Sequence, residues 1–184
     1  MKRIVILAGV LLLSVSAFAA KTSNLENTIQ SHYNNRELNV GKTYSKKVSQ
    51  TEKSISSTRA GVRDQIISFA QKKLGSPYVW GATGPNSFDC SGFVGYVFKS
   101  AANLTLPRVS SDQATFKPKI SSMNMKKGDL VFFNTTGKGI SHVGIYMGNR
   151  QFIHASSGSR RVTVSSLDSN FYSKTFRWAI NPFS

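Results

Sequence analysis

A single cysteine, Cys90, occurs in the 184-residue chain, so no intramolecular disulfide can form. The thiolate is the reactive form of cysteine, and because its ordinary pKa is about 8.5, a thiol enzyme needs surroundings that favour ionisation. Asp89, Cys90 and Ser91 stand where a loop rich in glycine and proline enters an apolar stretch with helical spacing. A helix start offers partial positive charge and unpaired N–H groups, which favour a thiolate and can hold an oxyanion. The cysteine count alone leaves a reactive thiol and a buried structural cysteine equally open.

A base within hydrogen-bond reach, oriented by a third polar group, is the next requirement of thiol hydrolysis. His32 lies in a polar segment, whereas His142 starts one β-rich stretch and His154 ends the next. Their separation of 12 residues is even, and directly paired residues of an antiparallel hairpin share a face. The two histidines can therefore pair directly only across an odd-numbered connection or a β-bulge, so we expect no plain two-residue loop around residues 147–149. A hydrogen-bonded strand residue without a catalytic role remains the alternative for each histidine.

The same three side chains, Cys90, His142 and His154, could instead bind zinc, because catalytic zinc often has three protein ligands. Against this alternative, the cysteine lies at a predicted helix start and no closely spaced pair of ligands is present. We therefore expect no metal and no other cofactor.

The elements that must position these residues form two groups along the chain. Apolar residues at helical spacing predict one helix over residues 62–74, closed by Gly75 and Pro77, and a second over residues 91–102. Short β-rich stretches separated by Gly, Asn and Ser follow, and the expected strands are 130–133, 142–147, 152–154, 162–164 and 176–180. Helices followed by an antiparallel sheet predict an α+β fold.

Residues 1–19 are typical of a secretory signal peptide. Lys2 and Arg3 form a basic start, residues 4–13 are an almost unbroken apolar run, and Ala17 and Ala19 supply small residues at alternate positions. The apolar run is too short to span a membrane, and no later stretch approaches about 18 consecutive apolar residues. We therefore expect an exported protein, periplasmic or secreted, with no transmembrane segment.

Residues 20–60 are rich in Ser, Thr, Asn, Lys and Gln and contain few large apolar residues. Such a segment predicts a flexible basic tail, with a short helix near residues 25–33, ahead of one domain over residues 61–184. The whole chain carries a formal charge of +16, which favours anionic partners. No nucleic-acid-binding motif is found, so the expected polyanions are cell-wall polymers or acidic lipid head groups.

Five motifs, in order, resemble those of the NlpC-type cell-wall peptidases. The first motif joins Gly75-Ser76-Pro77-Tyr78-Val79-Trp80-Gly81 with Phe88-Asp89-Cys90-Ser91-Gly92-Phe93-Val94. The second is Leu106-Pro107-Arg108 with Ser110 and Gln113, and the third is Gly128-Asp129-Leu130-Val131-Phe132-Phe133. The fourth is Ser141-His142-Val143-Gly144-Ile145-Tyr146, and the fifth is Phe152-Ile153-His154-Ala155-Ser156. The match runs in order from about Arg63 to Pro182, roughly two thirds of the chain. The sequence departs from the family pattern at Ala82, where a second glycine is common, and at Phe93, where leucine is usual.

The resemblance implies a papain-like α+β core in which N-terminal helices pack on an antiparallel β-sheet. It also implies a triad of Cys90 as nucleophile, His142 as base and His154 as orienting residue. The implied activity is hydrolysis of amide bonds in peptidoglycan stem peptides through a Cys90 thioester. Two alternatives remain: a non-catalytic wall-binding protein on the same fold, or a thiol amidase or acyltransferase with another substrate.

Four residues are expected to bind the substrate. By the resemblance, Tyr78 lines the site, and Asp89 and Ser91 match positions that in some members hold the free amine of a stem peptide. The guanidinium of Arg108 suits a stem carboxylate. Asp89 alternatively caps the helix that follows it, and Trp80 is expected to be a core aromatic residue.

Overall fold

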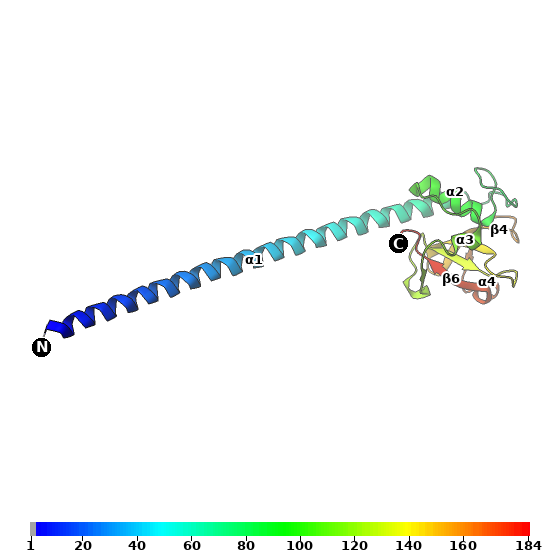
Figure 1. Cartoon of the computed structure of the whole chain (residues 1–184). Coiled ribbons are helices and arrows are strands. Elements are labelled where there is room, and N and C mark those ends of the chain that lie inside the picture. The colour runs from blue at the N-terminus through cyan, green and yellow to red at the C-terminus, as the bar shows by residue number, and fades with distance from the viewer. Residues whose placement is uncertain (1–2) are drawn as a thin grey trace. The chain divides into compact units, whose positions relative to one another are not determined.

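The computed structural model describes residues 3–184, although only the backbone is described for residues 3–23, 33, 37–39 and 41. The chain divides into two units, one ending at Ser56 and the other running from Ser57 to Ser184. Each unit is described by itself. Figure 1 shows the helix α1 (Arg3–Gln71), which supplies all of the first unit and the beginning of the second.

In the first unit, every described side chain from residue 24 to residue 56 is exposed. The prediction of a short helix confined to residues 25–33 is wrong, because the helix continues through the whole segment. Residues 21–60 contain no proline and one glycine, Gly41, so nothing in the sequence forces the helix to stop. Local bonds such as that from Gln30 Nε2 to Asn34 Oδ1, at 3.1 Å, join successive turns. Whether this segment acts as a flexible tail stays a prediction.

The side chains of the predicted signal peptide, residues 1–19, lie outside the described residues. Among the helices whose side chains the structure does describe, none combines the length and the apolar character that crossing a membrane requires.

The second unit contains a six-stranded antiparallel sheet with the strand order β1-β6-β2-β3-β4-β5. Its strands are β1 (Lys119–Ile120), β2 (Leu130–Phe133), β3 (His142–Gly148), β4 (Gln151–Ser156), β5 (Arg161–Ser166) and β6 (Phe176–Ile180). The helices are α2 (Cys90–Ala102), α3 (Ser110–Gln113) and α4 (Asn170–Thr175), with a 3₁₀ turn at Ser122–Asn124. The predicted α+β fold is confirmed, and β1, α3 and α4 are additions that the sequence pattern did not predict.

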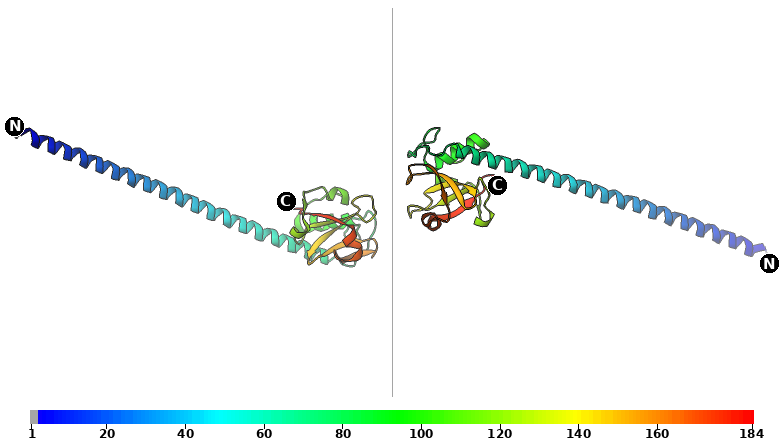
Figure 2. Two further views of the ribbon diagram at one scale, coloured as in Figure 1. Left: turned by 90° about the horizontal axis from the view of Figure 1, so that it is seen from below. Right: turned by 180° about the vertical axis from the view of Figure 1, so that it is seen from behind.

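The two faces of the sheet bury different kinds of side chain, because alternate residues of a strand point to opposite faces. One face carries mainly aliphatic residues and packs with Val94, Val97 and Phe98 of α2. The other face carries Phe133 and Phe152 and packs with Tyr172 of α4. Figure 2 shows α2 (green) and α4 (red) on opposite sides of the sheet.

The last turns of α1 belong to the core of the second unit. Ile66 and Ala70 are fully buried there. Arg63 forms an ion pair with Asp129 at 2.7 Å and also donates to Asn181 Oδ1 at 2.7 Å. This guanidinium therefore ties the end of α1 to the loop before β2 and to the C-terminal segment after β6.

Candidate active site

The candidate nucleophile, Cys90, is the first residue of α2 and is only 8% exposed. Asp89 is the N-cap, and its Oδ1 accepts a hydrogen bond from the Gly92 N–H at 2.6 Å. Aspartate suits this position because its carboxylate pairs an N–H that the helix itself leaves unpaired. A Cβ on Gly92 would collide with the Ala82 carbonyl, so glycine is what lets the preceding loop close over the helix start. The predicted helix start at the cysteine is confirmed.

The surroundings of the thiol oppose ionisation in the free protein. Burial, followed by the negative charge of Asp89, raises the pKa of Cys90. Backbone hydrogen bonds from Ser91, Val143 and Cys90 itself act in the other direction but do not outweigh the burial. The backbone N–H groups at the helix start thus favour the thiolate, as expected, but burial and Asp89 outweigh them, so that the pKa of Cys90 is raised overall. The bond from Val143 places the sulfur beside the beginning of β3.

The hairpin of β3 and β4 contains the irregularity that the histidine spacing requires. Ile145 pairs with Ile153, and the register then shifts between Tyr146 and Gly148. A two-residue turn follows at Asn149 and Arg150, both with positive φ. The expectation that no plain two-residue loop could join these strands is confirmed, because a bulge accompanies the turn.

Across this hairpin the two histidines meet diagonally. His142 Nε2 lies 2.7 Å from His154 Nδ1, and the ring planes are nearly perpendicular at 83°. The register of the hairpin, continued toward its open end, places Gly144 opposite His154. A Cβ on Gly144 would lie 2.5 Å from the Phe152 ring and 3.3 Å from the His154 Cβ. The missing side chain at Gly144 therefore leaves room for the two imidazoles to pack together.

Both histidines are held in the neutral form by their surroundings. Burial lowers the pKa of His142 to about 4. Burial, and then repulsion from His142, also lowers the pKa of His154. The rings of Phe133, Phe152 and Tyr172 enclose the pair, which explains why a charged imidazole is unfavourable there.

The histidine pair uses its ring nitrogens in a way that argues against zinc. His142 Nε2 and His154 Nδ1 are engaged with each other, and His154 Nε2 lies 2.9 Å from Ser165 Oγ. Only His142 Nδ1 is left to interact with Cys90. Among the residues whose side chains the structure describes, no group of three or more His, Cys, Asp or Glu is arranged to hold a metal ion.

On the other side of the cysteine, Arg108 is bound to Asp89. Arg108 Nη2 lies 2.5 Å from Asp89 Oδ2, and Nη1 lies 3.2 Å from Asp89 Oδ1. The guanidinium also donates to Gly81 O at 3.0 Å and to Ser91 Oγ at 3.1 Å. The structure thus brings three of the four expected substrate-binding residues into one network. Their roles toward substrate stay predictions.

Tyr78 and Trp80 lie on the loop that precedes α2 and differ sharply in burial. The pKa of Tyr78 is raised by partial burial and then by the charges of Cys90 and Asp89, which places its hydroxyl near the thiol. Trp80 is 87% exposed, so the prediction that it is a core residue is wrong. The fully buried Phe88 fills the space under this loop instead.

Two residues near the histidines were missed from the sequence, Ser165 of β5 and Tyr172 of α4. Ser165 Oγ lies 2.9 Å from His154 Nε2, and the hydroxyls of Ser165 and Ser156 both lower the pKa of Tyr172. The signal available in the sequence was weak. In β5 a polar Ser165 alternates with the apolar Val162 and Val164, which indicates a second face but not what lies on it.

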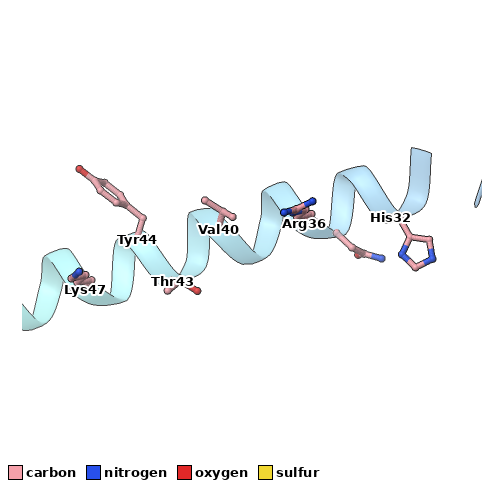
Figure 3. A pocket seen from close by; sticks show the side chains of 7 residues that line it. His32, Arg36, Val40, Thr43, Tyr44 and Lys47 are labelled. Atoms are coloured by element: carbon pink, nitrogen blue, oxygen red, sulfur yellow. The ribbon is translucent and has the colours of Figure 1, made fainter. Parts of the chain in front are cut away.

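A hollow of about 770 Å³ is lined by residues of α1 in the first unit, namely His32, Asn35, Arg36, Val40, Thr43, Tyr44 and Lys47. Figure 3 shows these side chains following one another along a single helix. Side chains of one helix cannot enclose a ligand by themselves, so the hollow is a surface groove and not an active-site cavity.

The antiparallel sheet, with a cysteine-initiated helix on one face, defines a papain-like α+β domain. The chain belongs to the NlpC/P60 family, whose sequence profile matches residues 75–181. The resemblance seen in the sequence motifs is therefore confirmed.

Three similar proteins illustrate the range of this family. A probable endopeptidase p60 of Listeria monocytogenes is 54% identical over 90 residues, which are 49% of this chain and 18% of that protein. The crystal structure of the NlpC/p60 domain of peptidoglycan hydrolase SagA is 34% identical, with a TM-score of 0.57 over 65% of this chain and 97% of that one. RipD of Mycobacterium tuberculosis, described as a non-catalytic NlpC/p60 domain protein adapted to peptidoglycan binding, is 25% identical, with a TM-score of 0.54 over 65% of this chain and 96% of that one. The chain thus spans less than a fifth of the length of the p60 relative.

Proposed function

We propose that the protein is a cysteine endopeptidase that hydrolyses amide bonds in peptidoglycan stem peptides, with Cys90 as nucleophile, His142 as base and His154 as orienting residue. The observation that carries this proposal is the pairing of His142 with His154 at 2.7 Å, next to Val143, whose backbone lowers the pKa of Cys90. The family and its named endopeptidases and hydrolases supply the substrate class.

The reaction begins from a neutral thiol and a neutral imidazole. As Cys90 Sγ attacks the carbonyl carbon, its proton passes to His142 Nδ1 and the carbonyl electrons move to the oxygen. Backbone N–H groups at the start of α2, together with the Tyr78 hydroxyl, hold this oxyanion. His142 then protonates the leaving amine as the C–N bond breaks and a thioester forms. Water, deprotonated by His142, attacks the thioester and regenerates the thiol.

The ion pair of Arg108 and Asp89 provides opposite charges for the ends of a peptide. A stem amine binds Asp89 and Ser91, while a stem carboxylate binds the Arg108 guanidinium. Because Arg108 is 44% exposed whereas Asp89 is only 10% exposed, the guanidinium is the partner that moves to admit the substrate.

The N-terminal segment serves export and attachment. Residues 1–19 direct export and are removed, which leaves the protein periplasmic or secreted. Residues 20–60 carry seven lysines and arginines against three glutamates, and they tether the enzyme to anionic cell-wall polymers.

A non-catalytic wall-binding protein is the second candidate, favoured by the similarity to RipD and by the raised pKa of Cys90. An amidase or acyltransferase with another substrate is a third. Turnover by wild type separates the second candidate from an enzyme, and the products separate the third from an endopeptidase.

The test is digestion of purified wall fragments with mass analysis of the products. Wild type should release fragments cut within the stem peptide, and Cys90→Ala should release none. Ser122→Ala, which replaces an exposed serine, is the matched control and should cleave like wild type. The product masses also decide between the γ-D-glutamyl bond and the D,D cross-link. Absence of cleavage by folded wild-type protein, or equal cleavage by Cys90→Ala, would contradict the proposal.

A further inference from the structure

A line of polar groups continues from the histidine pair away from Cys90. His154 Nε2 lies 2.9 Å from Ser165 Oγ. The hydroxyls of Ser165 and Ser156 lie near the Tyr172 hydroxyl, and both lower its pKa. Ser156 Oγ in turn accepts the Ser159 N–H at 3.1 Å. The chain of contacts therefore runs from His142 through His154, Ser165 and Tyr172 to Ser156.

This line lies in a place where an unpaired polar group is unfavourable. His154 is fully buried, and Ser156 is 6% exposed. The ring centroids of Phe152 and Tyr172 lie 4.7 Å and 5.4 Å from that of His154. A ring N–H of His154 that lost its acceptor would find no ready replacement.

The catalytic cycle requires one particular tautomer of His154. When His142 holds the proton of the thiol, both of its nitrogens are protonated, and its Nε2–H must donate to His154 Nδ1. A neutral imidazole carries one N–H, so His154 must then be protonated on Nε2. If His154 carried its proton on Nδ1 instead, it would donate to His142 Nε2. Neutral His142 would then carry its proton on Nδ1, the nitrogen that has to accept the proton of Cys90.

We propose that Ser165, supported by Tyr172, is a positioning residue that holds His154 in the Nε2–H tautomer. Ser165 Oγ accepts the Nε2–H of His154, and its own hydroxyl donates to the Tyr172 oxygen, in the direction in which Ser165 acts on the Tyr172 pKa. The hydrogen bond on one nitrogen of an imidazole thus decides what the other nitrogen does.

Removing the Ser165 hydroxyl leaves the Nε2–H of His154 buried without an acceptor. The Nδ1–H tautomer then becomes the better paired one, and the base is disabled without any change in substrate contacts. We expect Ser165→Ala to lower kcat at least tenfold with little change in KM. Ser165→Thr keeps the hydroxyl in a strand that tolerates β-branched residues, so most of the activity should return. Tyr172→Phe should have a smaller effect, because Ser165 can still accept.

The inference rests on the proposed function, and the experiment separates the two. Steady-state kinetics on soluble stem peptides compare wild type, Cys90→Ala, Ser165→Ala, Ser165→Thr and Tyr172→Phe, with the exposed Ser173→Ala as control. Imidazole ¹⁵N shifts of the full chain identify the tautomers. If wild type is no more active than Cys90→Ala, the proposed function fails. If wild type is active but Ser165→Ala has the same kcat, the role of Ser165 fails alone.

The spectra give a readout that a merely structural role would not change. Wild-type His154 should be protonated on Nε2, and the Ser165→Ala protein should shift toward Nδ1. A wild-type His154 protonated on Nδ1 would overturn the inference. Should Ser165→Ala fail to fold, the tautomer of wild-type His154 and the kcat of Ser165→Thr still decide, since a loss of tenfold or more in folded Ser165→Thr would contradict the inference.

Discussion

On the α2 side of the candidate site, Asp89 and Arg108 form a charged pair that reaches the solvent, whereas on the β3–β4 side His142 and His154 are neutral and enclosed by aromatic rings. The first side holds its charges because a carboxylate, a guanidinium and backbone N–H groups neutralise one another. The second side has no counter-charge among these contacts. Burial there removes water without replacing it by an opposite charge, so the neutral forms are stable.

The difference bears on how the two sides can cooperate. The proposed nucleophile, Cys90, has its pKa raised and the proposed base, His142, has its pKa lowered, so proton transfer from Cys90 to His142 is unfavourable in the free protein. Interactions that stabilise the separated charges only in the transition state accelerate a reaction most effectively. The peptide carbonyl, whose oxygen takes up the negative charge, is the missing partner.

The largest effect is expected on lowering the pH. His142 must be neutral to accept a proton, and its pKa in the folded protein is about 4. Activity should therefore stay near its plateau down to about pH 5 and fall about tenfold for each further pH unit below 4. Measurement of kcat/KM on a soluble stem peptide as a function of pH checks this. An acid limb near pH 6.5, the ordinary pKa of histidine, would show that burial does not hold His142 neutral and would contradict the difference between the two sides of the site.

The same shift has a consequence for stability. In the unfolded chain His142 takes up a proton below about pH 6.5, but in the folded protein only below about 4. The unfolded state therefore binds more protons in this window, and the free energy of unfolding should decrease as the pH falls from 6.5 to 4. Replacing His142 with Asn should make that part of the curve less steep, and the remaining slope comes from His154, whose pKa is also lowered by burial.

A smaller effect, with opposite signs in two variants, tests the charged side. Asp89→Asn removes the charge that raises the pKa of Cys90, so alkylation of the thiol at pH 7 should become several-fold faster. Asparagine still caps the helix, which keeps α2 in place. Arg108→Ala leaves the carboxylate uncompensated, and alkylation should become slower.

The exposed Asp112→Asn is the matched control for these rates and should react like wild type. Shifts of the same sign in Asp89→Asn and Arg108→Ala would show that the pair acts on the thiol through structure and not through charge.

The smallest effect is expected from removing residues 1–56. The described side chains of residues 24–56 are exposed, so a chain starting at Ser57 should keep its melting temperature and hydrolyse small soluble stem peptides within about twofold of the wild-type rate. Activity on intact walls should fall because the basic segment is gone. Loss of folding would show that this segment belongs to the domain.

Much of the fold could be predicted because local patterns determine it. Strands β2 and β6 have the predicted bounds, and Cys90 starts the predicted second helix. The parity of the histidine spacing even required the bulge found near Met147. The order of strands in the sheet and the position of α4 depend on contacts between distant segments, which no local pattern records.

The wrong or missing predictions also concern contacts between segments that are distant in the sequence. Trp80 was expected in the core but is 87% exposed, whereas Phe88, farther along the same loop, is fully buried. The pKa of Cys90 depends on its burial and on Asp89 as well as on the helix start, so the helix start alone did not indicate the net direction. Ser165 reaches His154 only through the register of β4 and β5.

The burial of Cys90 also affects how long the protein survives in the presence of oxidants. Peroxides attack the thiolate, and susceptibility follows the thiolate fraction and the exposure of the sulfur. The sulfur belongs to a side chain that is only 8% exposed and whose pKa is raised, so both factors are small. With no second cysteine to resolve a sulfenic acid, one oxidation could not be repaired internally. The neutral, buried thiol thus protects the proposed nucleophile from oxidation until a substrate arrives.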